Sequence, residues 1–181
     1  MTTPIKLILL DMDGLSCDWV KAILKFYPEF KDIDQFNKHP EKVGLVKQFY
    51  LNRPNIFARL EMIPQFEQLF EYLVGTGVEL GWLTAIDPNH HNPELVKRNK
   101  TQWALENVDW KFGTDTAENM VTVDRSADKS MYAEPGVLLI DDYYKNTDAF
   151  SAAGGEALCV GECGEWTAED VINQVRLMLM N

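Results

Sequence analysis

Short apolar runs alternate with helical patterns along most of the chain. Five runs have the length and the apolar character of buried strands, at residues 5–10, 78–83, 120–123, 136–140 and 157–160. Apolar positions at helical spacing lie between them, at residues 64–74, 93–107 and 167–180. Strands that alternate with helices predict an α/β fold: a Rossmann-like parallel sheet with helices on both faces.

The segment between the first strand and the first of these helices interrupts the alternation. It holds helical patterns at residues 19–26 and 42–50, which are separated by prolines. A connection this long is unusual in a compact domain unless it has structure of its own. We therefore expect a small helical cap, residues 17–62, over the ends of the strands, and a Rossmann-like core formed by residues 1–16 and 63–181.

The charge balance limits the partners to be expected. The chain has 17 Lys and Arg residues against 28 Asp and Glu residues, which gives a net charge of -11. A surface this negative repels a phosphate backbone, so long nucleic acids are not expected as partners. One small phosphorylated ligand, held by a local lysine and a metal ion, is compatible with this charge.

Cysteine usage and hydropathy point to a reducing compartment. The three cysteines, Cys17, Cys159 and Cys163, are too few for a disulfide framework, and their spacing does not fit a zinc site. No apolar run approaches the roughly 20 residues of a membrane helix, and the apolar start of the chain leads into acids, unlike a signal peptide. We expect a cytoplasmic protein without a membrane partner, either a monomer or a homodimer.

Acidic residues follow two of the predicted strands. The first strand runs into Asp11, Asp13 and Gly14, and the fourth runs into Asp141 and Asp142. Ligands of open α/β sheets bind at the carboxyl ends of the strands. Two residues apart on an extended segment, the first two carboxylates point the same way, and such a pair suits Mg²⁺. The glycine allows a sharp turn directly after them.

A hydroxyl and a cation follow two other strands. The second strand ends at Thr84, whose hydroxyl suits a phosphoryl oxygen, although threonine is also common at strand ends for conformational reasons. Lys129 lies twelve residues before Asp141, where a cation would balance carboxylates; a solvated surface lysine is the alternative. The chain has no G-x-x-x-x-G-K-[ST] loop, which excludes a P-loop nucleotide triphosphatase. Because the last acidic pair follows the lysine, the order of residues also excludes a receiver domain.

The order of these residues resembles the haloacid dehalogenase superfamily, and the resemblance covers nearly the whole chain. Asp11 and Asp13 match its first motif, Thr84 and Lys129 follow, and an acidic pair comes last. The resemblance implies that Asp11 is a nucleophile that forms an aspartyl-phosphate. It implies that Asp13 is the general acid and base, and that Thr84 and Lys129 hold the phosphoryl oxygens.

The same resemblance implies a magnesium site and a reaction class. Asp141, with Asp142 behind it, would bind Mg²⁺ beside Asp11 and the backbone carbonyl of Asp13. Superfamily members that only cleave carbon–halogen bonds lack the second aspartate, and ion-pumping members have threonine there. Asp13 therefore favours a phosphatase, with a phosphomutase as a less favoured alternative.

Within the superfamily, the chain is most similar to the 5'(3')-deoxyribonucleotidases. The similarity lies in the stretches LLDMDG at 9–14, DW at 18–19, DK at 128–129, LLIDD at 138–142 and AAGGEA at 152–157. It implies that Trp19 and Phe57 stack on a nucleobase and that Ala85 contacts the substrate, with core packing as the alternative for both aromatics. Two departures stand out: Ala85 replaces a common hydroxyl residue, and Tyr143 and Tyr144 replace a common Arg-Pro pair.

This resemblance implies a magnesium-dependent phosphomonoesterase of the 5'-nucleotidase type, with a (deoxy)nucleoside monophosphate as the substrate. A polynucleotide 3'-phosphatase and a small phosphosugar phosphatase are the alternatives among enzymes, although the former needs a basic groove. A non-catalytic nucleotide-binding or regulatory protein on the same fold is the alternative from another class. His90 and His91 lie in the loop after the second strand and have no role assigned.

Overall fold

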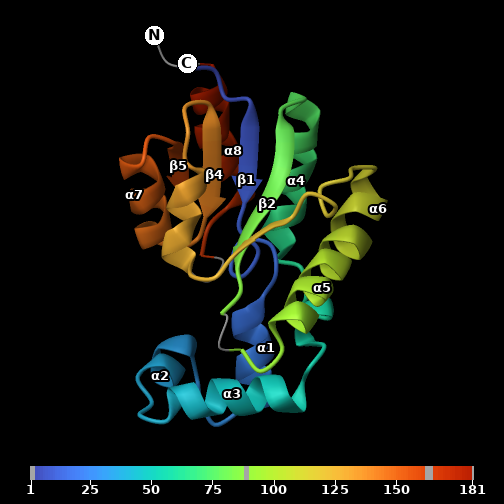
Figure 1. The fold of residues 1–181 in the computed structure, drawn as a ribbon, viewed down its shortest axis with the longest axis vertical. Helices are drawn as coiled ribbons and strands as arrows, with labels where there is room; N and C mark the ends of the chain where they lie inside the picture. The colour runs from blue at the N-terminus through green and yellow to red at the C-terminus, as the bar shows by residue number, and fades with distance from the viewer. Residues whose placement is uncertain (1–2, 88–89, 162–164, 181) are drawn as a thin grey trace.

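Five parallel strands form the centre of the molecule. The computed structural model in Figure 1 describes residues 3–87, 90–161 and 165–180, so Cys163 lies outside the described residues. The strand order is β3-β2-β1-β4-β5. The strands are β1 (Leu7–Leu10), β2 (Glu79–Ala85), β3 (Val121–Val123), β4 (Val137–Asp141) and β5 (Glu156–Cys159). The predicted Rossmann-like α/β fold is confirmed.

The position of β1 at the centre of the sheet determines where the site forms. Leu10 pairs with Trp82 on one side and with Ile140 on the other, so the carboxyl ends of β1, β2 and β4 lie at one edge. The chain leaves β1 to build β2 and β3 on one side, and then returns past β1 to build β4 and β5 on the other. Ligands of open α/β sheets bind at such a switch in strand order.

Helices cover both faces of the sheet, as the alternating pattern predicts (Figure 1). Ile8 and Leu10 pack into the main core with α4 (Pro64–Thr76), α5 (Pro93–Ala104) and α8 (Ala168–Leu179). Leu9 points to the other face, where it shares a smaller core with Phe150. That face carries α7 (Tyr144–Ala152) and the 3₁₀-helix η3 (Ser126–Tyr132).

Element ends differ from the sequence-based bounds by one to a few residues. Strand β2 continues to Ala85 and β4 to Asp141, so Thr84 and Asp141 lie within strands rather than after them. The helix predicted at residues 93–107 leaves α-geometry after Ala104 and continues through a π-helical turn, η2 (Leu105–Asp109), into α6 (Trp110–Phe112). None of the described helices combines the length and the apolar character that a bilayer crossing requires.

The segment expected to form the cap is helical and has a small core of its own. It contains α1 (Trp19–Phe26), α2 (Ile33–Asn37), α3 (Lys42–Asn52) and the 3₁₀-turn η1 (Ile56–Ala58). Its buried apolar cluster consists of Ile23, Tyr27, Phe36 and Phe49. In Figure 1 these helices lie beyond the carboxyl ends of the strands. The bounds 17–62 for the cap stay a prediction.

Candidate active site

Three carboxylates meet where β1 and β4 end. One oxygen from each of Asp11, Asp141 and Asp142 lies within 4.8 Å of the others. The side chains of Asp11 and Asp141 are buried, and that of Asp142 is half-buried. Register explains the meeting, because Leu10 and Ile140 pair across the sheet and the acids follow them directly. A set of carboxylate oxygens this close together is a site that a hard cation prefers.

Lys129 bridges two of these acids from the η3 helix. Its Nζ lies 2.6 Å from Asp11 Oδ1 and 2.6 Å from Asp141 Oδ2, and the residue is 1% exposed. Asp141 also accepts hydrogen bonds from the backbone N–H of Tyr143 at 2.9 Å and from Asn146 Nδ2 at 3.0 Å. Lys129 is therefore a buried member of the site, and not the solvated lysine of the alternative.

Burial and like charge shift the protonation of the acidic cluster. Burial raises the pKa of Asp11 to about 6, with the negative charge of Asp141 opposing the lowering effect of Lys129. Burial and, to a lesser extent, the charges of Asp11 and Asp141 together raise the pKa of Asp142 to about 8. Burial alone would lower the pKa of Lys129, but Asp11 and Asp141 outweigh it and raise that pKa. When all three carboxylates are ionised, their negative charge exceeds what Lys129 balances, and a bound cation would offset that excess.

A second buried lysine, Lys100, completes the site, and the sequence analysis missed it. Its Nζ lies 2.6 Å from Asp13 Oδ2 and donates to Thr84 Oγ1 at 2.7 Å. Lys100 is 1% exposed, whereas the side chain of Asp13 is 36% exposed. Because the Thr84 oxygen accepts from Lys100, its own hydrogen is left to donate. The Asp13 carboxylate is thus paired with Lys100 and remains partly exposed to solvent.

The sequence held one signal for Lys100. It lies on helix α5 four residues after Val96 and three before Trp103, and both of these residues are buried. A lysine on the apolar face of an amphipathic helix is rarely buried without a partner. Such a lysine predicts a carboxylate opposite the helix, but only the fold shows that the carboxylate belongs to Asp13.

Gly14 allows the loop after β1 to approach the acidic pair. Its φ is +89°, a conformation that favours glycine, and a Cβ at this position would collide with the carboxylate of Asp142. The loop is closed by hydrogen bonds from the backbone N–H groups of Ser16 and Cys17 to the carbonyl of Met12, both at 3.0 Å. The sharp turn predicted at Gly14 is therefore present and is required for close packing.

A cavity of about 490 Å³ opens over these residues. The core contributes Asp11, Asp13, Ala85, Ser126, Lys129, Asp142, Tyr143 and Asn146 to its lining, and the cap contributes Trp19 and Lys42. Trp19 and Ala85, both predicted to contact substrate, thus lie beside the predicted nucleophile and general acid. The indole Nε1–H of Trp19 donates to Tyr50 Oη at 3.1 Å, which fixes the ring in place.

Phe57 is placed differently from Trp19. It is 6% exposed, and it is not among the described residues that line the cavity. Lys100 Nζ lies 5.1 Å from the centroid of its ring, and the Tyr50 ring lies 5.4 Å away. A lysine against an aromatic face is a favourable contact. Phe57 therefore supports Lys100, and its stacking on a base stays a prediction.

A second cavity, of about 500 Å³, adjoins the first at Lys42, which lines both. Val43, Val46 and Tyr50 give it an apolar wall, and His90 closes the other side. The His90 ring lies 4.8 Å from the Tyr50 ring. A polar cavity that continues into an apolar one fits a ligand with a charged group and an apolar body.

Solved structures provide the comparison with known proteins, since no family model and no curated protein matches the chain. A haloacid dehalogenase-like hydrolase from Xanthomonas campestris aligns with a TM-score of 0.57 and 12% identity over 98% of this chain and 97% of its own. A superfamily hydrolase from Ehrlichia chaffeensis aligns at 0.53 and 12% over 100% of both chains. A Streptococcus pneumoniae hydrolase aligns at 0.53 and 14% over 97% and 100%.

The chain has the haloacid dehalogenase fold. The acidic cluster fits the Mg²⁺ that hydrolases of this fold generally use, because its donors are all carboxylate oxygens from Asp11, Asp141 and Asp142. The carboxylate of Asp13 pairs with Lys100 instead, and metal binding through its backbone carbonyl stays a prediction. Of the predicted site residues, Asp11, Asp141 and Asp142 thus gather around Lys129, whereas Asp13 and Thr84 contact Lys100.

Proposed function

We propose that the chain is a magnesium-dependent phosphomonoesterase that acts through a phosphorylated Asp11. The observation that carries this proposal is the separate pairing of its two carboxylates: Asp11 with Lys129 and Asp13 with Lys100. Carboxylates in different environments are able to take different roles in one reaction. The haloacid dehalogenase fold supports hydrolase chemistry at this edge.

In the first step, the Asp11 carboxylate attacks phosphorus and the bond to the leaving oxygen breaks. Asp13, in its acid form, donates its proton to that oxygen, so an alcohol leaves. Lys129 and the Thr84 hydroxyl stabilise the charge on the phosphoryl oxygens. The open side of Asp13 faces the cavity, where the leaving group would lie.

In the second step, Asp13 acts as the base. Its carboxylate takes a proton from water, and the water oxygen attacks the phosphorus of the aspartyl-phosphate. The bond from phosphorus to Asp11 breaks, which releases inorganic phosphate and restores the Asp11 carboxylate and the acid form of Asp13. Mg²⁺ held by Asp11, Asp141 and Asp142 would offset the charge of the phosphate as a carboxylate approaches it.

The substrate we propose is a nucleoside monophosphate, with its phosphate above Asp11 and its base in the adjoining cavity. Trp19 lines the first cavity and Tyr50 the second, so both lie along the path of such a ligand. Base stacking on aromatic rings is worth about 1–3 kcal/mol per base. A single nucleotide is also compatible with the net charge of -11, whereas the phosphate backbone of a polynucleotide would be repelled by it.

A substrate panel tests the proposal. Purified protein is incubated with purine and pyrimidine nucleoside monophosphates, glucose 6-phosphate and 4-nitrophenyl phosphate, each with Mg²⁺ or with EDTA, and released phosphate is measured. We expect hydrolysis in the presence of Mg²⁺ and none in EDTA. Among the esters, a nucleotide should have the highest kcat/KM. A preference for the sugar phosphate would overturn the substrate. Absence of hydrolysis on every ester, in protein that binds nucleotide, would support the non-catalytic alternative.

A further inference from the structure

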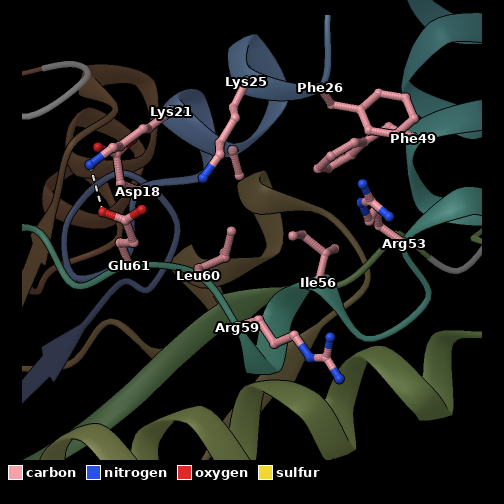
Figure 2. Close-up of a pocket in the computed structure, with 11 residues that line it drawn as sticks. Asp18, Lys21, Lys25, Phe26, Phe49, Arg53, Ile56, Arg59, Leu60 and Glu61 are labelled. Carbon is pink, nitrogen blue, oxygen red and sulfur yellow. Dashed lines mark hydrogen bonds and ion pairs between the residues drawn. The ribbon is translucent and has the colours of Figure 1, made fainter.

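A third cavity lies on the side of the cap away from the candidate active site. It encloses about 350 Å³ between α1, the end of α3, the η1 turn and the returning segment at residues 59–61 (Figure 2). Trp19 of helix α1 lines the catalytic cavity, whereas Lys21 and Lys25 of the same helix line this one. The catalytic cavity and this one have no described lining residue in common, so they are separate sites.

The lining is cationic, although the chain as a whole has a net charge of -11. Lys21, Lys25, Arg53 and Arg59 line the cavity, against Asp18 and Glu61. Both acids are engaged. Glu61 pairs with Lys21 at 2.5 Å, and Asp18 Oδ1 accepts the backbone N–H of Lys21 at 2.8 Å.

Three of these cations have no ion-pair partner among the described residues, although the charge of Lys25 also acts on Glu61, the partner of Lys21. Lys25, Arg53 and Arg59 form no ion pair with any residue in the described part of the chain. Among the side chains drawn in Figure 2, the single dashed line joins Lys21 to Glu61. The Arg53 guanidinium lies 5.4 Å from the centroid of the Phe26 ring, which orients it while leaving its donors unused. Unpaired cations gathered around one cavity favour an anion as ligand.

The floor of the cavity is apolar. Phe49 and Leu60 are buried there, and Ile56 is partly buried beside them. A phosphate accepts hydrogen bonds from several cations at once, and arginine matches its oxygens in pairs. An apolar floor favours a ligand that has an apolar group beside its anionic group, because that apolar group is buried against the floor on binding.

From this combination we infer that the cavity binds a small organic phosphate, with the phosphate among Lys25, Arg53 and Arg59 and an apolar ring on Phe49 and Leu60. The volume of about 350 Å³ is near the lower end for small-molecule sites, which limits the ligand to one phosphate and a ring system of modest size. This site is independent of the proposed hydrolysis, because it shares no described lining residue with the catalytic cavity.

Binding of benzylphosphonate, a phosphate ester mimic that cannot be hydrolysed, tests the inference. Titration by calorimetry in EDTA keeps metal out of the catalytic cavity. We expect saturable binding by the unaltered chain, at least about tenfold weaker binding of inorganic phosphate, and no binding of benzyl alcohol, since charge and ring both contribute. The double variant Arg53→Gln, Arg59→Gln should bind benzylphosphonate at least about tenfold more weakly, because charged hydrogen bonds are worth about 1.5–3 kcal/mol each.

The matched control is Lys31→Gln, an exposed cap residue that does not line the cavity. It should bind as the unaltered chain does, and thermal melts should show that all variants are folded. Equal binding by the double variant and the unaltered chain would overturn the inference, as would no saturable binding at all. Equal affinity for phosphate and benzylphosphonate would overturn the inference that the ligand carries an organic ring. None of these outcomes depends on turnover, so each is distinguishable from failure of the proposed hydrolysis.

Discussion

The candidate active site at the edge of the sheet and the helical cap place their charged side chains differently. At the edge, Lys129 and Lys100 are buried and each is paired with the carboxylates that face it. In the cap, an aromatic cluster around Phe36 and Phe49 forms the interior, while lysines and arginines lie outside. Buried and paired charges keep a fixed geometry, and fixed geometry is what proton and phosphoryl transfer require. This difference supports our proposal that the core carries out the chemistry and that the cap selects the substrate.

Apart from loss of the nucleophile Asp11, the largest expected effect comes from Asp13→Asn, which would remove proton transfer and keep the three carboxylates around Lys129. We expect kcat on a nucleoside monophosphate to fall by about 10²–10⁴-fold. The loss should be smaller with 4-nitrophenyl phosphate, whose leaving group needs little protonation. Steady-state kinetics on both substrates measure the difference. Equal losses of kcat on the two substrates would mean that Asp13 is a structural residue and does not transfer a proton.

The next effect sharpens the role of Lys100, which contacts both Asp13 and Thr84. Lys100→Met should lower kcat by about 10²-fold, because hydrogen bonds to charged groups are worth about 1.5–3 kcal/mol each. In that background, Asp13→Asn should cost less than it does in the unaltered chain, since residues in one network are not additive. Lys97→Met, at an exposed position on the same helix, is the control. Additive losses would show that the two residues act separately.

A smaller effect is expected in the cap, where Trp19 lines the catalytic cavity. If the indole stacks on the base, Trp19→Ala should raise KM for nucleotides about tenfold and leave 4-nitrophenyl phosphate nearly unchanged. The control is Trp110→Ala, an exposed tryptophan far along the chain. Loss on every substrate together with a lower Tm would mean that Trp19 acts through core packing, which costs about 3–5 kcal/mol.

The smallest effect concerns stability without metal. The pKa values of about 6 for Asp11 and about 8 for Asp142 exceed the ordinary value of 3.8. Between about pH 4 and pH 8 the folded protein therefore holds protons that the unfolded chain has released, so the free energy of unfolding falls as pH rises. Calorimetry in EDTA should show Tm falling through this window, at about 2–4 °C per kcal/mol.

Two variants, and the addition of Mg²⁺, test whether the acidic cluster causes the fall of Tm with rising pH. Asp142→Asn should flatten it, whereas Asp148→Asn, at an exposed position, should not. Mg²⁺ should raise Tm more at pH 8 than at pH 5.5, because the cluster is then more fully ionised. A Tm that rises with pH in EDTA would contradict the shifted pKa values.

The sequence was sufficient for the sheet and for one half of the site. Apolar runs predict buried strands directly. The acids that follow Leu10 and Ile140 come together because the carboxyl ends of parallel strands lie at one edge of the sheet. Lys100 could not be placed this way, because a helix face shows that a residue is buried but not which strand end it meets. Phe57 shows the same limit: its aromatic character favours burial, and only the fold shows that Lys100 covers its ring.

Covalent phosphorylation of Asp11 tests the central claim most directly. The protein is mixed with a nucleoside monophosphate and Mg²⁺, quenched in acid within the first turnovers, and digested for peptide mass spectrometry. The Asp13→Asn variant is included with 4-nitrophenyl phosphate, whose leaving group needs little protonation, because it should then form the intermediate but hydrolyse it slowly. We predict the mass of one phosphoryl group on the peptide that contains Asp11, and its absence in Asp11→Asn. Hydrolysis that proceeds at a normal rate in Asp11→Asn, or without any phosphorylated peptide in either active protein, would contradict the account.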